Sequence, residues 1–193
     1  MRDIVRSIEE EYVRYKKLGE GALAQVADGD LSKEPPGNGN SLAALVWHIS
    51  GNLESRFTSF RTSDGEKPTR DRDGEFVPRQ VTRAELMAKW EQGWAPVLKE
   101  VQALVDADLA ATIVIRTQPL RIDQALHRSL AHAAYHVGQL VYLAKLWAGA
   151  RFNSLSIPIG QSAAFNAKLA ASKAAYSATD YLKTRAGSDA GGR

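Results

Sequence analysis

The chain has 193 residues, of which 44% are hydrophobic and 24% charged, as expected for a globular protein with a sizeable core. Its 25 Lys and Arg residues and 22 Asp and Glu residues are interspersed, so no concentrated basic surface points to a nucleic-acid partner. The lack of cysteine excludes disulfides, thiolate metal ligands and cysteine nucleophiles. The charged N-terminal stretch and the absence of a long apolar run predict no signal peptide and no membrane span, and we expect a cytoplasmic protein.

The first half of the chain predicts two amphipathic helices. Residues 2–27 carry apolar side chains at helical spacing, and the Pro- and Gly-rich residues 28–40 predict a loop. A second helix is expected from about Asn40 to Arg61, with His48 at the edge of its apolar stripe. Small polar side chains beside this histidine suit a solvated pocket better than a dry core; they are Ser41, Asn52, Ser55 and Ser59.

A long loop and a third helix follow. Residues 62–81 are rich in charge, Gly and Pro, and their acidic and basic side chains either shape the mouth of a site or form a solvated, salt-bridged surface. Thr82 and Glu85 have the spacing of a capping box, which predicts the start of a helix that continues to about Val105. Pro96 is expected to kink this helix or break it locally.

The last part of the chain adds a β-hairpin and a fourth long helix. Residues 112–122 are β-branched around a turn expected at Thr117-Gln118-Pro119. The fourth helix is expected from about Asp123 to Ala148, where Gly149 stops it, and a fifth from about Ser162 to Lys183. We therefore predict an all-α four-helix bundle over residues 1–183, with a small β-hairpin before the fourth long helix and a disordered tail over residues 184–193.

Three of the four histidines form the candidate metal site. His132 and His136, in the sequence HAAYH, project about 40° apart on one helical face, whereas His127 projects about 140° away from His132. With His48 on another inward face, they give three imidazoles, which suit zinc, nickel, iron or copper. Three protein ligands leave coordination positions open, where a metal can lower the pKa of water or polarise an oxygen or thiol.

Other interpretations of the histidines stay open or fail at this point. Histidines four residues apart also occur as hydrogen-bonded pairs without a metal. A zinc protease is excluded, because Ala133 stands where the HExxH motif has its glutamate. A ferritin-like di-iron site is disfavoured, because paired Glu-x-x-His motifs are missing. Gln139 is either a hydrogen-bonding partner of a ligand or an ordinary polar residue of the bundle.

Three stretches of the sequence resemble the DinB/YfiT-like superfamily of metalloenzymes, and more narrowly a DinB-like subgroup of unknown function. They are WHISGNLESRFTSFRTSDGEKPTRDRDGEF at 47–76, LHRSLAHAAYHVGQLVYLAK at 126–145 and SLSIPIGQSAAFN at 154–166. The resemblance implies a DinB-like four-helix bundle that forms a homodimer. It also implies a divalent metal, usually zinc or nickel, held by His48, His132 and His136.

Characterised relatives of this kind include transferases and isomerases that use a low-molecular-weight thiol. The resemblance therefore implies a metal-dependent enzyme, a thiol-dependent S-transferase or a hydrolase, acting on an unknown small molecule. The alternative is a non-catalytic dimeric binding or stress-response protein with a structural or vestigial metal site. An open coordination position beside a pocket would favour the enzyme, and a closed four-ligand site would favour the alternative. No general base can be assigned from the sequence.

Overall fold

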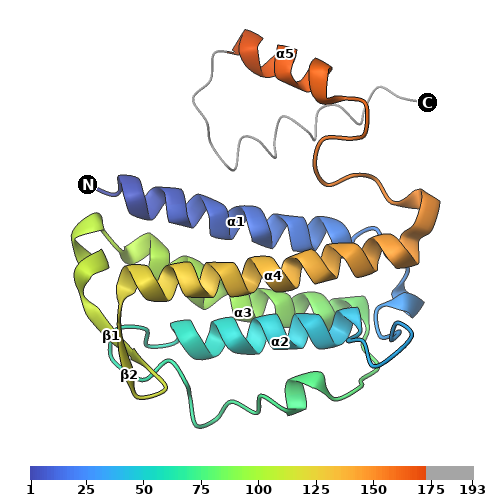
Figure 1. Ribbon diagram of the computed structural model, residues 1–193. Helices are drawn as coiled ribbons and strands as arrows, with labels where there is room; N and C mark the ends of the chain where they lie inside the picture. The colour runs from blue at the N-terminus through green and yellow to red at the C-terminus, as the bar shows by residue number, and fades with distance from the viewer. Residues whose placement is uncertain (173–193) are drawn as a thin grey trace.

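Four long helices form a bundle in the computed structural model, which describes residues 1–172. They are α1 (Asp3–Leu23), α2 (Leu42–Phe57), α3 (Arg83–Ala103) and α4 (Ile122–Ala148). Helices α1 and α4 run in one direction and α2 and α3 in the other (Figure 1). Helix α1 packs on α4 and α3, and α2 packs on α3 and α4. The predicted all-α bundle is confirmed.

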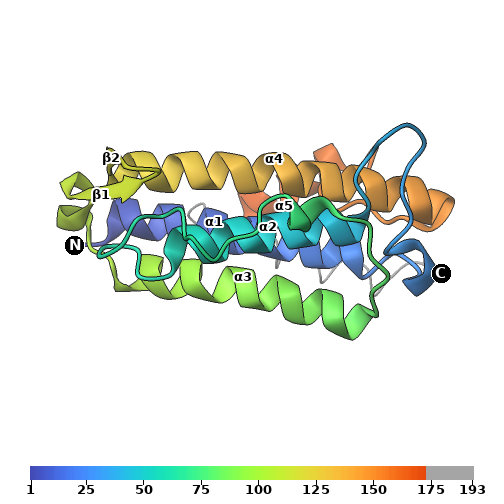
Figure 2. The same ribbon diagram turned by 90° about the horizontal axis from the view of Figure 1, so that it is seen from below.

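The direction of the helices explains the long loop after α2. Because α2 and α3 are parallel neighbours, the chain must return along the whole bundle before α3 can start, as Figure 2 shows from below. Helix α2 ends earlier than predicted, at Phe57, and Ser59 takes a positive φ of 50° that no helix continues through. Phe60, which we placed inside the helix, is still 97% buried, because the loop turns it back into the core.

Helix α3 begins where the sequence predicts, but it differs from the prediction at Pro96. The predicted capping box is present, with Thr82 accepting from the backbone of Glu85. Of the kink or local break expected at Pro96, the break is wrong, because α3 runs unbroken through this residue. A proline removes the donor for the carbonyl four residues earlier, and that residue, Gln92, is exposed, so water can replace the lost partner.

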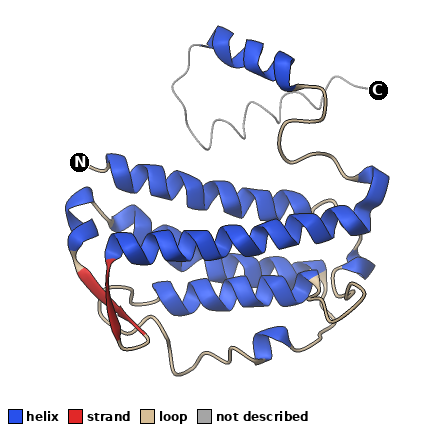
Figure 3. Cartoon of the chain, in the orientation of Figure 1, coloured by secondary structure: helices blue, strands red, loops and turns tan. Residues whose placement is uncertain are grey.

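The β-hairpin sits at one end of the bundle, directly before α4 (Figure 3). Its strands are β1 (Thr112–Ile115) and β2 (Gln118–Arg121), paired antiparallel. The predicted turn centre is wrong by one residue, because Arg116 and Thr117 form the turn, with φ of 55° and 63°, and Pro119 pairs with Val114. A two-residue hairpin turn needs positive φ at both positions, which proline cannot adopt.

The apolar core is densest where α3 meets α1 and α2. Trp90 and Trp94 are fully buried there, with Tyr12 edge-on to Trp94. The backbones of α2 and α3 touch, since a Cβ on Gly93 would lie 2.3 Å from the Cα of Ser50. Glycine at this position therefore sets the close approach of these two helices.

Beyond α4 the chain turns at Gly149, which has the positive φ of 57° expected of a helix stop. A fifth helix, α5 (Ser162–Ser172), begins where predicted and lies outside the bundle (Figure 1). The rest of the expected fifth helix and the expected disordered tail lie outside the described residues. Over residues 1–172, none of the helices combines the length and apolarity needed to cross a membrane.

Candidate metal centre

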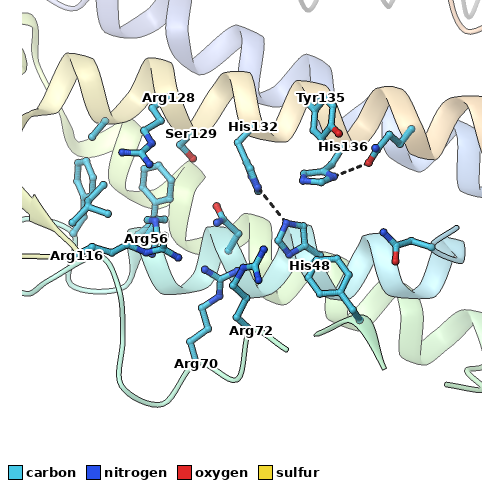
Figure 4. A pocket seen from close by; sticks show the side chains of 18 residues that line it. His48, Arg56, Arg70, Arg72, Arg116, Arg128, Ser129, His132, Tyr135 and His136 are labelled. Carbon is cyan, nitrogen blue, oxygen red and sulfur yellow. Dashed lines mark hydrogen bonds between the residues drawn. The ribbon is translucent and has the colours of Figure 1, made fainter. Parts of the chain in front are cut away.

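The structure brings the three predicted histidines together between α2 and α4. His48 comes from α2, and His132 and His136 come from α4 (Figure 4). Nε2 of His48 lies 3.2 Å from Nε2 of His132, and the candidate ligand atoms of all three residues lie within 4.8 Å of one another. His127 is exposed and takes no part, as the helical wheel predicted.

His48 is oriented by a buried ion pair. Its Nδ1 lies 2.8 Å from Oε2 of Glu75, and Arg70 donates to both oxygens of the same carboxylate, at 2.7 and 2.9 Å. Because a carboxylate only accepts, Nδ1 of His48 carries the proton and Nε2 presents its lone pair to the cluster. Gly51, one turn along α2, makes room, since a Cβ there would lie 2.2 Å from Oε1 of Glu75.

His136 is oriented in the same way by a neutral partner. Its Nδ1 donates to Oε1 of Gln139 at 2.8 Å, which directs Nε2 toward the other histidines. Of the two roles open for Gln139, the hydrogen-bonding partner of a candidate ligand is the one observed. A histidine ligand that donates its second N–H to a carboxylate or an amide oxygen is the usual arrangement in metal sites.

The residues present fit a divalent metal ion. Bonds of about 2.0–2.1 Å from zinc to imidazole nitrogen place two tetrahedral ligand nitrogens about 3.3–3.4 Å apart. The 3.2 Å between Nε2 of His48 and Nε2 of His132 is close to this spacing. Because Nε2 of His48 presents a lone pair, Nε2 of His132 is the donor in this hydrogen bond, and a cation in place of the donated proton would face three imidazole nitrogens.

The surroundings keep the histidines of α4 in their neutral, ligating form. Burial, together with the smaller effects of the nearby His136 and His48, lowers the pKa of His132 to about 4. Burial also lowers the pKa of His136, although the hydrogen bond to Gln139 opposes this. For Glu75, burial acts to raise the pKa, but hydrogen bonds from His48 and Arg70 outweigh it and lower the pKa.

The histidines form part of the wall of a cavity of about 440 Å³ between α2, α4, the 58–82 loop and the hairpin. Phe76 stacks on His48 with ring centres 4.6 Å apart, and Tyr135 lies edge-on to His136. Of the small polar residues expected beside His48, Asn52 does line the cavity, whereas Ser55 instead donates to the backbone of Gly65. The cluster therefore opens onto a space large enough for a small molecule.

The sequence predicted the three histidines of the cluster, but it did not predict most of the residues that surround them. Glu75 was expected only to shape the mouth of a site, yet it is 94% buried and contacts His48. Among the arginines of the cavity, Arg72 was one of the loop residues expected either to shape the mouth of a site or to form a salt-bridged surface, and the others were not singled out; they are Arg56, Arg70, Arg116 and Arg128. Arg128 alone carried a usable signal, because it precedes His132 by four residues and so shares its helical face. The loop residues carried none, since their positions depend on a chain path without periodicity.

Comparison with known proteins agrees with the fold and leaves the chemistry open. Neither the curated proteins nor the solved structures contain a match to this chain. Residues 1–161 match a family described as "Protein of unknown function (DUF1572)", a match that includes all three histidines, the loop and the hairpin. The chain therefore belongs to the DUF1572 family, which lies within the DinB/YfiT-like superfamily.

Proposed function

We propose that this protein is a divalent-metal-dependent enzyme, with zinc or nickel held by His48, His132 and His136. The observation that carries the proposal is the convergence of three imidazoles on the wall of a 440 Å³ cavity. Within residues 1–172, no fourth His, Asp or Glu joins the group. Three ligands beside a cavity are typical of catalytic metal sites, whereas structural sites are usually closed by four.

The residues around the ligands support the same proposal. Glu75 and Gln139 fix the rings of His48 and His136, which prepares the site before a metal binds. Arg70 compensates the charge of Glu75, so this carboxylate is held for orientation and does not face the cavity as a free base. Phe76 covers one face of His48 and limits the access of water from the loop side.

The reaction we propose is transfer of a group to or from a thiol, or hydrolysis, with a small molecule bound in the cavity. A divalent ion supplies Lewis acidity at such a site, which lowers the pKa of a thiol or water brought to it. The protein's own residues hold the reacting groups in place: the lowered pKa values of His132 and His136 keep these two imidazoles neutral, and the cavity holds the reacting molecule beside them. A low-molecular-weight thiol is the cosubstrate that the S-transferase form of this proposal requires.

Metal analysis of untagged protein tests the ligand assignment. We expect about one divalent ion per chain in the wild-type protein and in the His127→Ala variant. His48→Ala, His132→Ala and His136→Ala should each hold far less. Equal metal content in all four variants would contradict the site, because His127 lies outside the cluster.

A second measurement separates a catalytic metal from a structural one. Because the tryptophan-rich core between α1, α2 and α3 is complete without the histidines, chelator-treated protein should stay folded and unfold cooperatively. A structural metal would instead make folding depend on the ion. Circular dichroism of the chelated protein distinguishes the two, and unfolding on chelation would favour the non-catalytic alternative.

A further inference from the structure

The cavity beside the histidines has a strongly basic lining. Five arginines line it, and no aspartate or glutamate of the described residues faces it. The arginines come from four parts of the chain, namely α2, the 58–82 loop, the hairpin and α4. They are Arg56, Arg70, Arg72, Arg116 and Arg128.

Three of these guanidinium groups are held in place by one carboxylate behind the cavity wall. Glu66 lies 2.8 Å from Arg56, 2.8 Å from Arg116 and 3.6 Å from Arg70. The hairpin turn that carries Arg116 is itself tied down, because Asp64 accepts the backbone N–H groups of Arg116 and Thr117 at 2.8 and 2.7 Å. The positively charged wall is thus built into the fold.

The remaining two arginines have fewer hydrogen bonds and ion pairs within the described residues. Arg128 is exposed on α4, and no hydrogen bond or ion pair ties it to another of residues 1–172. Arg72 has only a 3.6 Å ion pair with the fully exposed Asp73 and a position over the ring of Phe76. Figure 4 shows Arg128, Arg56 and Arg116 together on the hairpin side of His132.

The charges around the cavity do not balance. Glu66 and Glu75 are shared among Arg56, Arg70 and Arg116, which leaves positive charge in excess before Arg72 and Arg128 are added. Burial lowers the pKa of Arg56, Glu66 raises it, and the charges of Arg70 and Arg116 lower it again. Imidazole side chains carry no negative charge that could cancel this excess, and a divalent ion would increase it.

The helical rise gives the distance between the arginines and the histidines, and so the approximate length of a molecule that could contact both. Arg128 precedes His132 by one helical turn, about 6 Å along α4, and Arg56 follows His48 by about 12 Å along α2. Asn52 on α2 and Ser129 on α4 line the wall between the two ends, and Phe57, Phe60 and Ile115 line the cavity at the arginine end. We infer that the arginine end of the cavity binds a carboxylate or phosphate group of an organic anion, whose other end reaches the three-histidine cluster. Only the second half of this inference rests on the proposed function.

Calorimetric titration tests the anion subsite, with glutarate and phenyl phosphate as probes and uncharged glutaramide as control. It uses the protein both as isolated and after chelation, at low ionic strength. We expect at least one anion to bind the chelated protein in a 1:1 ratio, and glutaramide not to bind. Losing one charge-assisted hydrogen bond should weaken binding about tenfold or more in Arg128→Gln and in Arg116→Gln. The anion that binds more tightly identifies the group as carboxylate or phosphate.

Two further variants test whether anion binding depends specifically on the arginines of the cavity. Arg128→Lys should retain part of the affinity, because the charge remains while the paired donors are lost. Arg6→Gln removes an exposed arginine of α1 outside the cavity and should bind as the wild type does. Equal weakening by Arg6→Gln, or anion binding that needs the metal and ignores Arg128→Gln, would overturn the subsite. Because the chelated protein is measured separately, a failure of the metal assignment leaves this result intact.

Discussion

The two faces of α2 differ in how closely their partner helix approaches. On one face Gly93 lets the backbone of α3 touch that of α2 at Ser50, and tryptophans fill the adjoining space. On the other face α2 meets α4 across three imidazoles and a 440 Å³ cavity. One helix thus serves both as a core element and as the wall of a polar site. Small residues bring helices together, and hydrogen-bonded polar side chains hold them apart.

The largest expected effect is on the close face. Gly93→Ala would place a Cβ 2.3 Å from the Cα of Ser50, so α3 must move away from α2. We expect the free energy of unfolding, measured in denaturant, to fall by about 3 kcal/mol or more. Overpacking at a backbone contact cannot relax by a side-chain rotation. Gly138→Ala on α4 is the matched control, because nothing lies within 4 Å of its Cβ. It should be neutral or stabilising by up to about 1 kcal/mol, and similar losses in both variants would refute the contact.

On the face of α2 toward α4, Glu75 is the strongest single support of the proposed metal site. Glu75→Gln should lower metal affinity about 10- to 100-fold, because His48 loses its charged acceptor and Arg70 its buried partner. Competition with a chromogenic chelator measures this affinity. Asp73→Asn removes a charge two residues away on a fully exposed side chain and should leave affinity within about twofold. A comparable loss in Asp73→Asn would indicate a general charge effect.

The buried His132 between α2 and α4 should also make the stability of the chelated protein depend on pH. The pKa of His132 is about 4 in the folded protein, against 6.5 for a free imidazole. Above pH 6.5 both states are neutral there; between 6.5 and about 4 only the unfolded chain takes up the proton, so stability falls as pH falls. Discounted for partial exposure, the loss between pH 7.5 and pH 5 should be about 1 kcal/mol in urea unfolding. His132→Asn should flatten this dependence, and an unchanged slope would contradict it.

The smallest expected effect concerns Gln139, the uncharged residue that orients His136. Gln139→Leu removes the acceptor of His136 Nδ1 while keeping the bulk of the side chain. A hydrogen bond between neutral groups contributes about 0.5–1 kcal/mol, so metal affinity should fall roughly two- to fivefold. The same chelator competition measures it. A loss larger than that of Glu75→Gln would reverse the ranking of the two supports.

The local elements could be predicted because their causes are local. The apolar periodicity placed α1 to α4, and the pair Thr82 and Glu85 gave the start of α3 because capping involves only neighbouring residues. The spacing of His132 and His136 fixed a shared face, and the same rule placed His127 elsewhere. The turn of the hairpin was misplaced, since Arg116 and Thr117 adopt positive φ with help from Asp64, a contact about 50 residues away in sequence.

The sequence by itself determined the helices, the shared inward face of His48, His132 and His136, and the absence of thiolate ligands. The tertiary structure alone decided that α2 and α3 run parallel, which sends the 58–82 loop along the bundle and delivers Glu75 and Arg70 to His48. It also decided that arginines from four separate segments meet around one cavity. The physical reason is that periodicity records which side of a helix is buried, whereas loop path and charge clustering depend on contacts between distant residues.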